Sequence, residues 1–279
     1  MAALDLQILG PALIAGLLVL ATHVPLGMIV RERNIIFINI ALAQAAATGV
    51  VFGRVMWGGA EAWAIQASAV GAALLCAALL VWTGRRYAGL QEAVIGTVYV
   101  TVAAVLLMLL PYDQGGAEFL SQLMIGQILW VEPLQLLVVG LVYAVALVIW
   151  YYRDLGREQL LFYFVLAVVV ALSVQIVGVL PVFATLIIPH LAARAAPPRW
   201  RHLVAFNVGI AGYLAGLIIS LLFNTPAGAT VIVALVPAAL AARALIRRAI
   251  ASGSMAPGDA AGEATSAEAA PAEPTGGVG

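Results

Sequence analysis

Lysine is absent from this sequence, and charge of either sign is scarce. Of its 279 residues only 9% are charged, whereas 64% are apolar, and all 13 basic residues are arginine. A chain without lysine has no Walker A phosphate loop, which ends in Gly-Lys-Ser or Gly-Lys-Thr, and no lysine for Schiff-base chemistry. Soluble domains carry about 25% charged residues. The composition therefore excludes a water-soluble enzyme and a P-loop ATPase.

Sequence patterns for several other functions are also missing. Cys76 is the single cysteine, so no internal disulfide forms, and no Cys/His cluster indicates a structural zinc site. The His-Glu-x-x-His and Gly-x-Ser-x-Gly patterns of hydrolases do not occur. No apolar run carries a central pair of ionisable residues, which a proton-driven carrier normally needs. The function class that is left is a translocation passage powered by a separate protein, and we expect no nucleic-acid partner.

Long apolar runs are what the sequence has in abundance. Its mean hydropathy is +1.09, and about 20 apolar residues span the hydrocarbon core of a bilayer as a helix. Val182–Ala193 is shorter and is punctuated by Pro181 and Pro189, which predicts a broken or tilted helix; Phe119–Val131 predicts a re-entrant or interfacial one. We therefore expect an all-α, polytopic membrane bundle of about eight to nine transmembrane helices. The eight long runs are Leu6–Val30, Ile35–Met56, Ala62–Trp82, Glu92–Leu110, Pro133–Tyr152, Leu160–Leu180, His202–Phe223 and Thr230–Ile246.

The arginines predict how the chain is oriented in the membrane. Cytoplasmic loops carry an excess of Arg and Lys near the span ends, and alternate loops here hold 12 of the 13 arginines, with Arg54 as the exception. This arrangement requires Val182–Ala193 to cross the bilayer. It gives about nine crossings, with the N-terminus outside and the C-terminus in the cytoplasm. A hairpin that does not cross would give eight.

A change in composition divides the chain into two parts. From Ser252 onward Ala, Gly, Pro, Glu and Ser dominate and aromatic residues are absent, a composition that cannot bury enough apolar surface to fold. We predict a transmembrane domain over residues 1–250 and a disordered cytoplasmic tail over residues 251–279. The tail holds four acidic residues and no basic one, so the membrane part of this neutral chain has a net charge of +4.

Few polar side chains lie inside the apolar runs, and such residues usually mark a pathway or an interhelical hydrogen bond. The candidates for a translocation pathway that binds a metal ion are His23, Asn39, Gln44 and His190. Neutral imidazole is the commonest protein ligand for transition metals, and amide oxygens are weaker ligands. Alternatively, His23 and His190, each close to a proline, are hydrogen-bonded packing residues at helix kinks.

Several stretches, spread in order from about residue 10 to residue 245, together resemble the permease subunits of bacterial zinc/manganese-type ABC importers, the metal-chelate branch. The Val-Gln-Ile-Val-Gly-Val and Leu-Ile-Ile-Pro pair is the most specific of them. The stretches are His23-Val-Pro-Leu-Gly-Met-Ile-Val-Arg31 with Ile36-Phe-Ile-Asn-Ile-Ala-Leu-Ala-Gln44, Ile125-Gly-Gln-Ile-Leu-Trp-Val131, Ser173-Val-Gln-Ile-Val-Gly-Val179 with Val182-Phe-Ala-Thr-Leu-Ile-Ile-Pro189, and Asn224-Thr-Pro-Ala-Gly228.

The resemblance implies a homodimer of permeases in the bacterial inner membrane, docked on cytoplasmic ABC ATPase subunits and supplied by a periplasmic metal-binding protein. It implies that the substrate is a divalent transition metal ion, zinc or manganese foremost. It also implies that the chain holds no tightly bound cofactor and is not itself an enzyme. Two other functions stay open: a permease for a chelated metal or another small solute, and a membrane scaffold that does not transport.

This sequence departs from the family pattern at the usual metal ligands. Members of the family have a Gly-Asp-x-x-x-His stretch on the second helix, which places Asp and His on one helical face. Here those two positions are Ile40 and Gln44, and the outer turn begins with Asn224 where the family has Asp. The resemblance therefore implies a passage, without the anionic ligands of a tight metal site.

A second departure concerns the contact with the ATPase. The family's long amphipathic cytoplasmic stretch before the Val-Gln-Ile-Val-Gly helix is reduced here to the short loop from Arg153 to Gln159. ATPase docking is then expected through Arg153 and Arg157 of this loop, or through Arg199 and Trp200 of the loop between the short run and the next span. The alternative for both loops is that their arginines serve membrane topology alone.

Overall fold

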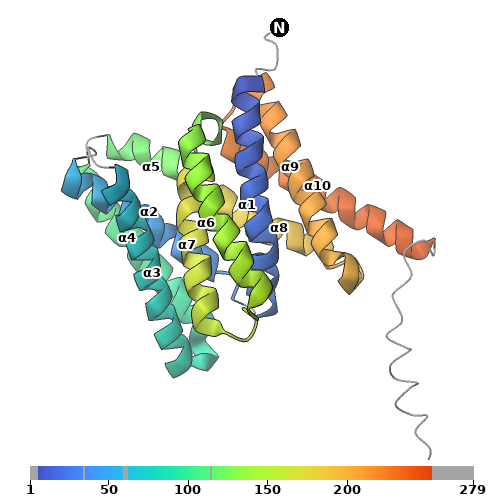
Figure 1. Ribbon diagram of the computed structural model, residues 1–279, viewed down its shortest axis with the longest axis horizontal. Coiled ribbons are helices and arrows are strands. Elements are labelled where there is room, and N and C mark those ends of the chain that lie inside the picture. The colour runs from blue at the N-terminus through green and yellow to red at the C-terminus, as the bar shows by residue number, and fades with distance from the viewer. Residues whose placement is uncertain (1–5, 34, 59–61, 114, 253–279) are drawn as a thin grey trace, which may run out of the picture.

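The computed structural model describes residues 6–33, 35–58, 62–113 and 115–252, and it leaves the side chains of residues 6–8 and 88 undescribed. Within these residues the chain forms ten α-helices and four short 3-10 turns and no strand (Figure 1). The prediction of an all-α bundle is thereby confirmed. The helices are α1 (Leu6–Glu32), α2 (Ile38–Trp57), α3 (Ala62–Arg86), α4 (Gln91–Leu109), α5 (Gly116–Ile125), α6 (Pro133–Tyr152), α7 (Gln159–Val177), α8 (Val179–Ala193), α9 (Arg201–Phe223) and α10 (Ala227–Ala251).

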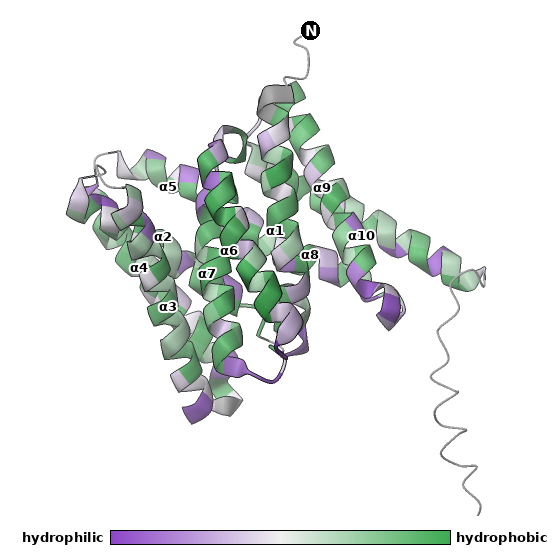
Figure 2. Cartoon of the chain, in the orientation of Figure 1, coloured by the Kyte–Doolittle hydropathy of each residue, from purple (hydrophilic) through white to green (hydrophobic). Residues whose placement is uncertain are grey.

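Eight of these helices are long and apolar enough to cross a membrane, and α5 and α8 are shorter. Hydrophobic residues cover the lengths of the long helices, whereas hydrophilic residues gather toward their ends (Figure 2). Because an apolar outer surface is stable only against lipid tails, the bundle is a multi-pass membrane domain. Helix α10 continues to Ala251, one residue past the predicted domain boundary, and the predicted tail lies almost wholly outside the described residues.

Helix α8 is too short to be recognised as a span by its length, yet it joins the same two ends of the bundle as α10. It begins directly after Gly178, which packs against Gly126 beside the start of α10. At its other end Arg194 lines one pocket together with Arg243 and Arg247 of α10. This course supports the prediction that the short run crosses the membrane.

The structure corrects one sequence-based expectation around α8 and narrows another. The run predicted over Leu160–Leu180 ends at Val177, because Gly178 has φ +90 and ψ 164, a backbone conformation that is open essentially only to glycine. Of the two forms expected for the short run with Pro181 and Pro189, broken or tilted, the structure excludes the break, because Val179–Ala193 is one continuous helix. Pro181 is its third residue, where the missing N–H has no partner within the helix anyway.

Three of the stretches that carry the family resemblance meet at one point on the backbone. Gly126 has φ +82, and a Cβ atom there would lie 2.1 Å from the carbonyl oxygen of Val177. A Cβ atom on Gly178 would lie 2.4 Å from the backbone nitrogen of Gly126, and one on Gly228 would lie 1.7 Å from the carbonyl oxygen of Ile125. The glycines therefore allow α5, the α7–α8 junction and the start of α10 to touch backbone to backbone.

Helix α2 is one of the most buried helices of the bundle and carries two of the candidate pathway residues. Most of its side chains are buried, and it packs against α3, α4, α7 and α8. Small residues permit this close approach: a Cβ atom on Gly49 would lie 2.4 Å from the carbonyl oxygen of Ser68 in α3. Small-residue interfaces of this kind are typical of helices packed in membranes.

The two ends of the bundle differ in charge. The C-terminal end of α3, which carries Arg85 and Arg86, and the connection between α6 and α7 lie at one end, whereas α5 lies toward the other (Figure 1). Arg33 ties the α1–α2 connection to the arginine-rich end, since its Nη2 donates hydrogen bonds to the carbonyl oxygens of Leu155 at 3.3 Å and Gly156 at 2.9 Å. We refer to the arginine-rich end as the inner end and to the end near α5 as the outer end.

Candidate functional site

His23 of α1 is fully enclosed, and its ring offers one nitrogen that has no partner. Its Nδ1 lies 2.9 Å from the carbonyl oxygen of Val19, so we assign the ring proton to Nδ1, which donates to that oxygen. Nε2 is buried and makes no hydrogen bond. A backbone carbonyl that holds the Nδ1 proton leaves the lone pair of Nε2 available, as in histidines that ligate metals.

Asn39 of α2 is also enclosed, and its amide is half satisfied. The Nδ2 group donates to the carbonyl oxygen of Val182 in α8 at 3.4 Å, whereas Oδ1 is buried without a partner. Among the buried side chains of the described residues, unpaired acceptors thus occur at His23 and Asn39, and the third unpaired atom is Nε of Arg33. Buried polar atoms without partners are rare and call for an explanation such as a bound ion or water.

His190 of α8 differs from His23 because both of its ring nitrogens are engaged. Nδ1 lies 2.8 Å from the carbonyl oxygen of Leu186, and Nε2 lies 2.8 Å from that of Val24 in α1. The helices are close here: a Cβ atom on Gly27 would lie 2.6 Å from Cε1 of His190. The ring therefore bridges α1 and α8, and in this conformation neither nitrogen is open to a metal ion.

The four candidate pathway residues do not converge on one point. His190 contacts the backbone beside His23, whereas Asn39 faces Val182, eight residues before His190 along α8. Gln44 is buried, but five residues of helix rotate it by about 140° relative to Asn39. The described residues contain no group of three or more His, Cys, Asp or Glu side chains that could hold a metal ion.

The arginines expected to dock the ATPase fall into two classes. Arg153 and Arg157 are paired within their own loop, with Glu158 at 2.8 Å and Asp154 at 3.1 Å. The hydrogen bonds from Arg153 hold the pKa of the Glu158 carboxyl below its usual range. Arg199 and Trp200 are exposed, and the guanidinium carbon of Arg199 lies 5.9 Å from the centre of the Trp200 ring.

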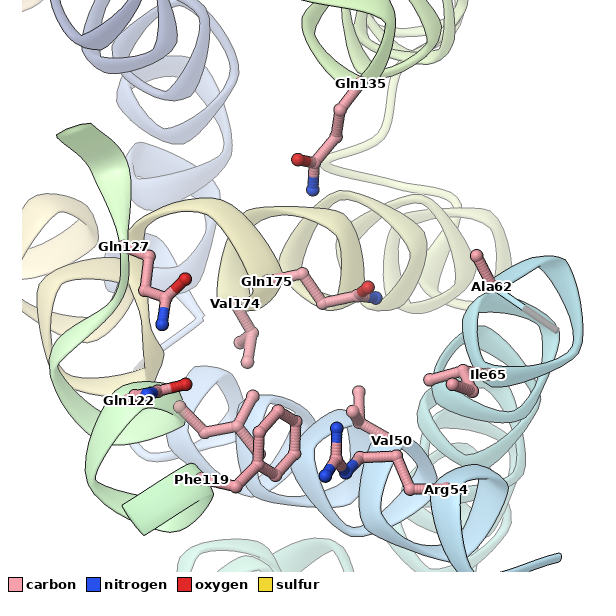
Figure 3. Close-up of a pocket in the computed structure, with 11 residues that line it drawn as sticks. Val50, Arg54, Ala62, Ile65, Phe119, Gln122, Gln127, Gln135, Val174 and Gln175 are labelled. Atoms are coloured by element: carbon pink, nitrogen blue, oxygen red, sulfur yellow. The ribbon is translucent and has the colours of Figure 1, made fainter. Parts of the chain in front are cut away.

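A polar pocket of about 250 Å³, hereafter the outer pocket, lies between α2, α3, α5, α6 and α7 at the outer end (Figure 3). Four glutamines point into it from three different helices and one connection (Figure 3). Gln127 and Gln175 stand within two of the resemblance stretches, which is the sequence signal that could have indicated them. Gln122 and Gln135 belong to no pattern. The pocket is lined by Val50, Arg54, Ala62, Ile65, Phe119, Gln122, Leu123, Gln127, Gln135, Val174 and Gln175.

Arg54 is held firmly at the edge of the outer pocket. Its Nε donates to both carboxylate oxygens of Asp113 at 3.2 and 3.0 Å. Its guanidinium carbon also lies 3.9 Å from the centre of the Phe119 ring, a cation–π geometry. The only arginine predicted outside the cytoplasmic loops therefore has an ion-pair partner at the outer end.

The match to a family model shows the family of this chain. The model of the ABC 3 transport family matches residues 5–158 and 155–246. An uncharacterized membrane protein from Synechocystis sp. is 26% identical over 258 residues, which cover 82% of this chain and 88% of that protein.

Two solved structures share the fold. A chain of PsaBC from Streptococcus pneumoniae, solved in complex with Fab, has a TM-score of 0.69 and 20% identity, and the match covers 85% of this chain and 92% of that one. A structure described as a metal-chelate type ABC transporter in an inward-facing conformation has a TM-score of 0.52 and 14% identity, covering 86% and 77%. The family match, which spans nearly all of the described bundle, confirms the resemblance seen in the sequence: the chain belongs to the ABC 3 transport family and is a multi-pass permease.

Proposed function

We propose that this permease imports a divalent transition metal ion, zinc or manganese, across the inner membrane. It acts as a homodimer, with cytoplasmic ATPase subunits that supply the energy and a periplasmic protein that delivers the metal. The C-terminus lies in the cytoplasm. The observation that carries the proposal is a pair of buried ligand atoms, Nε2 of His23 and Oδ1 of Asn39, that lack hydrogen-bond partners in a bundle with the fold of ABC permeases.

These two atoms suit transient contact with a passing ion. Imidazole nitrogen binds borderline metals such as zinc, and an amide oxygen adds a weak, neutral ligand. Because neither ligand atom carries a negative charge, the ion is held weakly and released readily, which transport requires. Gln44 belongs to the same passage in this proposal, and His190 contributes only if its ring moves away from the carbonyl oxygens of Val24 and Leu186, to one of which a neutral imidazole donates.

Contact with the ATPase is assigned to the inner end. Arg153 and Arg157 have their charges matched by Glu158 and Asp154, so we propose that they shape the α6–α7 loop. Arg199 and Trp200, which are exposed and have no acidic partner among the described residues, are proposed to contact the ATPase directly.

Uptake in proteoliposomes tests the function. The permease is reconstituted with its ATPase subunit and with ATP inside the vesicles, and zinc-65 or manganese-54 is supplied outside together with the binding protein. We expect ATP-dependent accumulation of one of the two metals. Assembly with the ATPase but no uptake of either metal would contradict the proposal and favour the scaffold or the chelate alternative.

A further inference from the structure

Three arginines of the inner end line one pocket between α8 and α10. The pocket, hereafter the arginine pocket, has a volume of about 470 Å³ and is lined by Leu191, Arg194, Ala195, Arg243 and Arg247. All three arginines are exposed, and no acidic side chain is among the described residues that line the pocket. The pocket therefore gathers positive charge from two helices in one place.

The charges of these three arginines are not matched by any described residue. Arg54, Arg153 and Arg157 form ion pairs with acidic side chains. By contrast, the guanidinium groups of the arginine pocket make neither an ion pair nor a hydrogen bond to a described residue. Guanidinium groups bind phosphate through paired, charge-assisted hydrogen bonds. Three unmatched guanidinium groups in one pocket therefore favour an anion with several acceptor oxygens, such as a phosphate group.

Apolar side chains lie next to the arginines on the side toward the membrane interior. Val236, Leu240 and Arg243 follow one another at spacings of four and three residues, which places them on one face of α10. Val236 and Leu240 are 47% and 64% exposed. On α8 the exposed Leu191 precedes Arg194 by three residues. Both helices thus present exposed apolar surface deeper in the membrane than their arginines, which is the order of acyl chain and phosphate in a phospholipid.

The last turns of α10 are open to the surroundings of the bundle. Among the residues from Leu240 to Ala251 only Ile246 is buried, and Figure 1 shows this C-terminal part of α10 extending away from the other helices. Because the bundle is a membrane domain, its exposed apolar surface is stable against lipid tails. The arginine pocket is therefore accessible to a lipid from the bilayer.

We propose that the arginine pocket binds the headgroup phosphate of an anionic phospholipid, whose acyl chains lie along Leu191, Val236 and Leu240. Basic pockets between transmembrane helices on the cytoplasmic side bind phospholipid head groups. Ligand sites have volumes of about 300–1,000 Å³, so a pocket of about 470 Å³ has room for a phosphate together with its glycerol. The site is separate from the proposed metal passage and depends neither on the transported ion nor on the ATPase.

Native mass spectrometry of the delipidated full-length chain, titrated with dioleoyl phosphatidylglycerol, tests the proposal. Dioleoyl phosphatidylcholine is the comparison lipid, because it has the same acyl chains and no net charge. Inorganic phosphate is the soluble probe, because it has the phosphate without the chains. We expect phosphatidylglycerol to bind about tenfold or more tightly than either of the other two.

The double variant Arg243→Gln/Arg247→Gln removes two of the three guanidinium groups. Each arginine near an anionic lipid surface strengthens binding about fivefold, so we expect the Kd for phosphatidylglycerol to rise about 25-fold. Arg85→Gln/Arg86→Gln is the matched control, since it removes the same charge from exposed residues at the inner end of α3 that do not line the pocket. It should leave this Kd unchanged within error, and both double variants should keep the melting temperature of the unaltered chain in neutral detergent.

Four results would overturn the proposal. Equal weakening in the two double variants would show a general attraction of lipid to the inner end. Binding of inorganic phosphate as tight as that of phosphatidylglycerol would assign the pocket to a soluble anion. Binding of lipid only after deletion of residues 253–279 would make the acidic tail the occupant. A change of oligomeric state in Arg243→Gln/Arg247→Gln, measured by size-exclusion chromatography with light scattering, would assign these arginines to contact between copies of the chain.

Discussion

His23 and His190 show how the partners of a single nitrogen decide what an imidazole can do. Both rings are buried and both contact a backbone carbonyl four residues earlier through Nδ1. They differ at Nε2, which faces Val24 in His190 and nothing in His23. A ring with both nitrogens engaged is a packing residue, and a ring with one open lone pair is a ligand candidate. We therefore propose that the two interpretations left open by the sequence apply to different residues, metal contact to His23 and packing to His190.

His23→Ala should lower metal uptake per assembled transporter at least several-fold, because it removes the nitrogen ligand of the proposed passage. His202→Ala is the control, since His202 is exposed at the start of α9. Zinc-65 uptake is divided by the amount of transporter that co-purifies with its ATPase. If uptake per transporter in His23→Ala equals that of the control while its melting temperature falls, His23 is a packing residue.

Gly126 and Gly178 contribute through their backbone conformation and through the close backbone contact that they permit. Both have positive φ with extended ψ, which costs about 1–3 kcal/mol for any other residue, and both leave room for a neighbouring main chain. Contact geometry thus accounts for the glycines in these two resemblance stretches, whereas the nearby Gln127 and Gln175 line the outer pocket.

Gly126→Ala should destabilise the bundle by about 2 kcal/mol or more, because strain is added to a Cβ overlap with the Val177 carbonyl. Gly71→Ala on α3 is the matched control: nothing lies within 4 Å of its added Cβ, and alanine favours a helix interior by up to about 1 kcal/mol. Thermal unfolding in detergent gives the comparison. Equal melting temperatures for the two variants would show that the three-way backbone contact is absent.

Among the helices, α8 determines the number of membrane crossings, because the chain has nine if α8 crosses and eight if it does not. Its 15 residues extend about 22 Å at 1.5 Å per residue, less than the hydrocarbon thickness of about 30 Å. It nevertheless runs from the glycine contact at the outer end to the arginines of α10. Because α1, α2, α9 and α10 surround it, α8 does not need to match the thickness of the lipid itself.

Single-cysteine labelling tests whether α8 crosses. In a Cys76→Ala background, Arg157→Cys and Arg199→Cys should react with an impermeant maleimide only in inside-out vesicles, since both loops then lie in the cytoplasm. Thr225→Cys, in the exposed turn between α9 and α10, should react only in right-side-out vesicles. Labelling of the Arg199→Cys and Arg157→Cys variants from opposite sides would establish that α8 returns as a hairpin.

At the scale of the whole molecule, the bundle is complete before the tail begins. Helix α10 ends at Ala251, and every buried residue of the described core precedes that point. We therefore expect the described helices to supply the stability of the bundle.

Deletion of residues 253–279 should leave membrane insertion, ATPase assembly and metal uptake unchanged within error, because these residues follow the last described helix and their composition cannot bury enough apolar surface to fold. Fluorescence-detected size-exclusion chromatography and the proteoliposome assay provide the measurements. A chain truncated after Gly228 is the contrasting control, since it lacks α10 and should fail to assemble. Loss of assembly in the tail deletion would assign the tail a structural role.

The membrane bundle, its elements and its family could be predicted from the residues alone. Apolar runs of about 20 residues can be stable only as spans, so the observed helices begin and end within a few residues of the predicted runs, and Pro133–Tyr152 agrees at both ends. The missing lysine excluded a phosphate loop, and the order of the resemblance stretches indicated the family that the comparisons confirmed. These properties are local or compositional, which is why they can be read without coordinates.

Contacts between helices set which buried polar atoms lack a hydrogen-bond partner and which side chains line the same pocket. The end of α7 at Val177 depends on contact between Gly178 and Gly126, 52 positions apart in the chain. The open nitrogen of His23, the engaged ring of His190 and the meeting of four glutamines around Arg54 likewise depend on neighbours from other helices. Helical periodicity gives the face on which a residue lies, but the rotation and depth of each helix are set by packing against its neighbours.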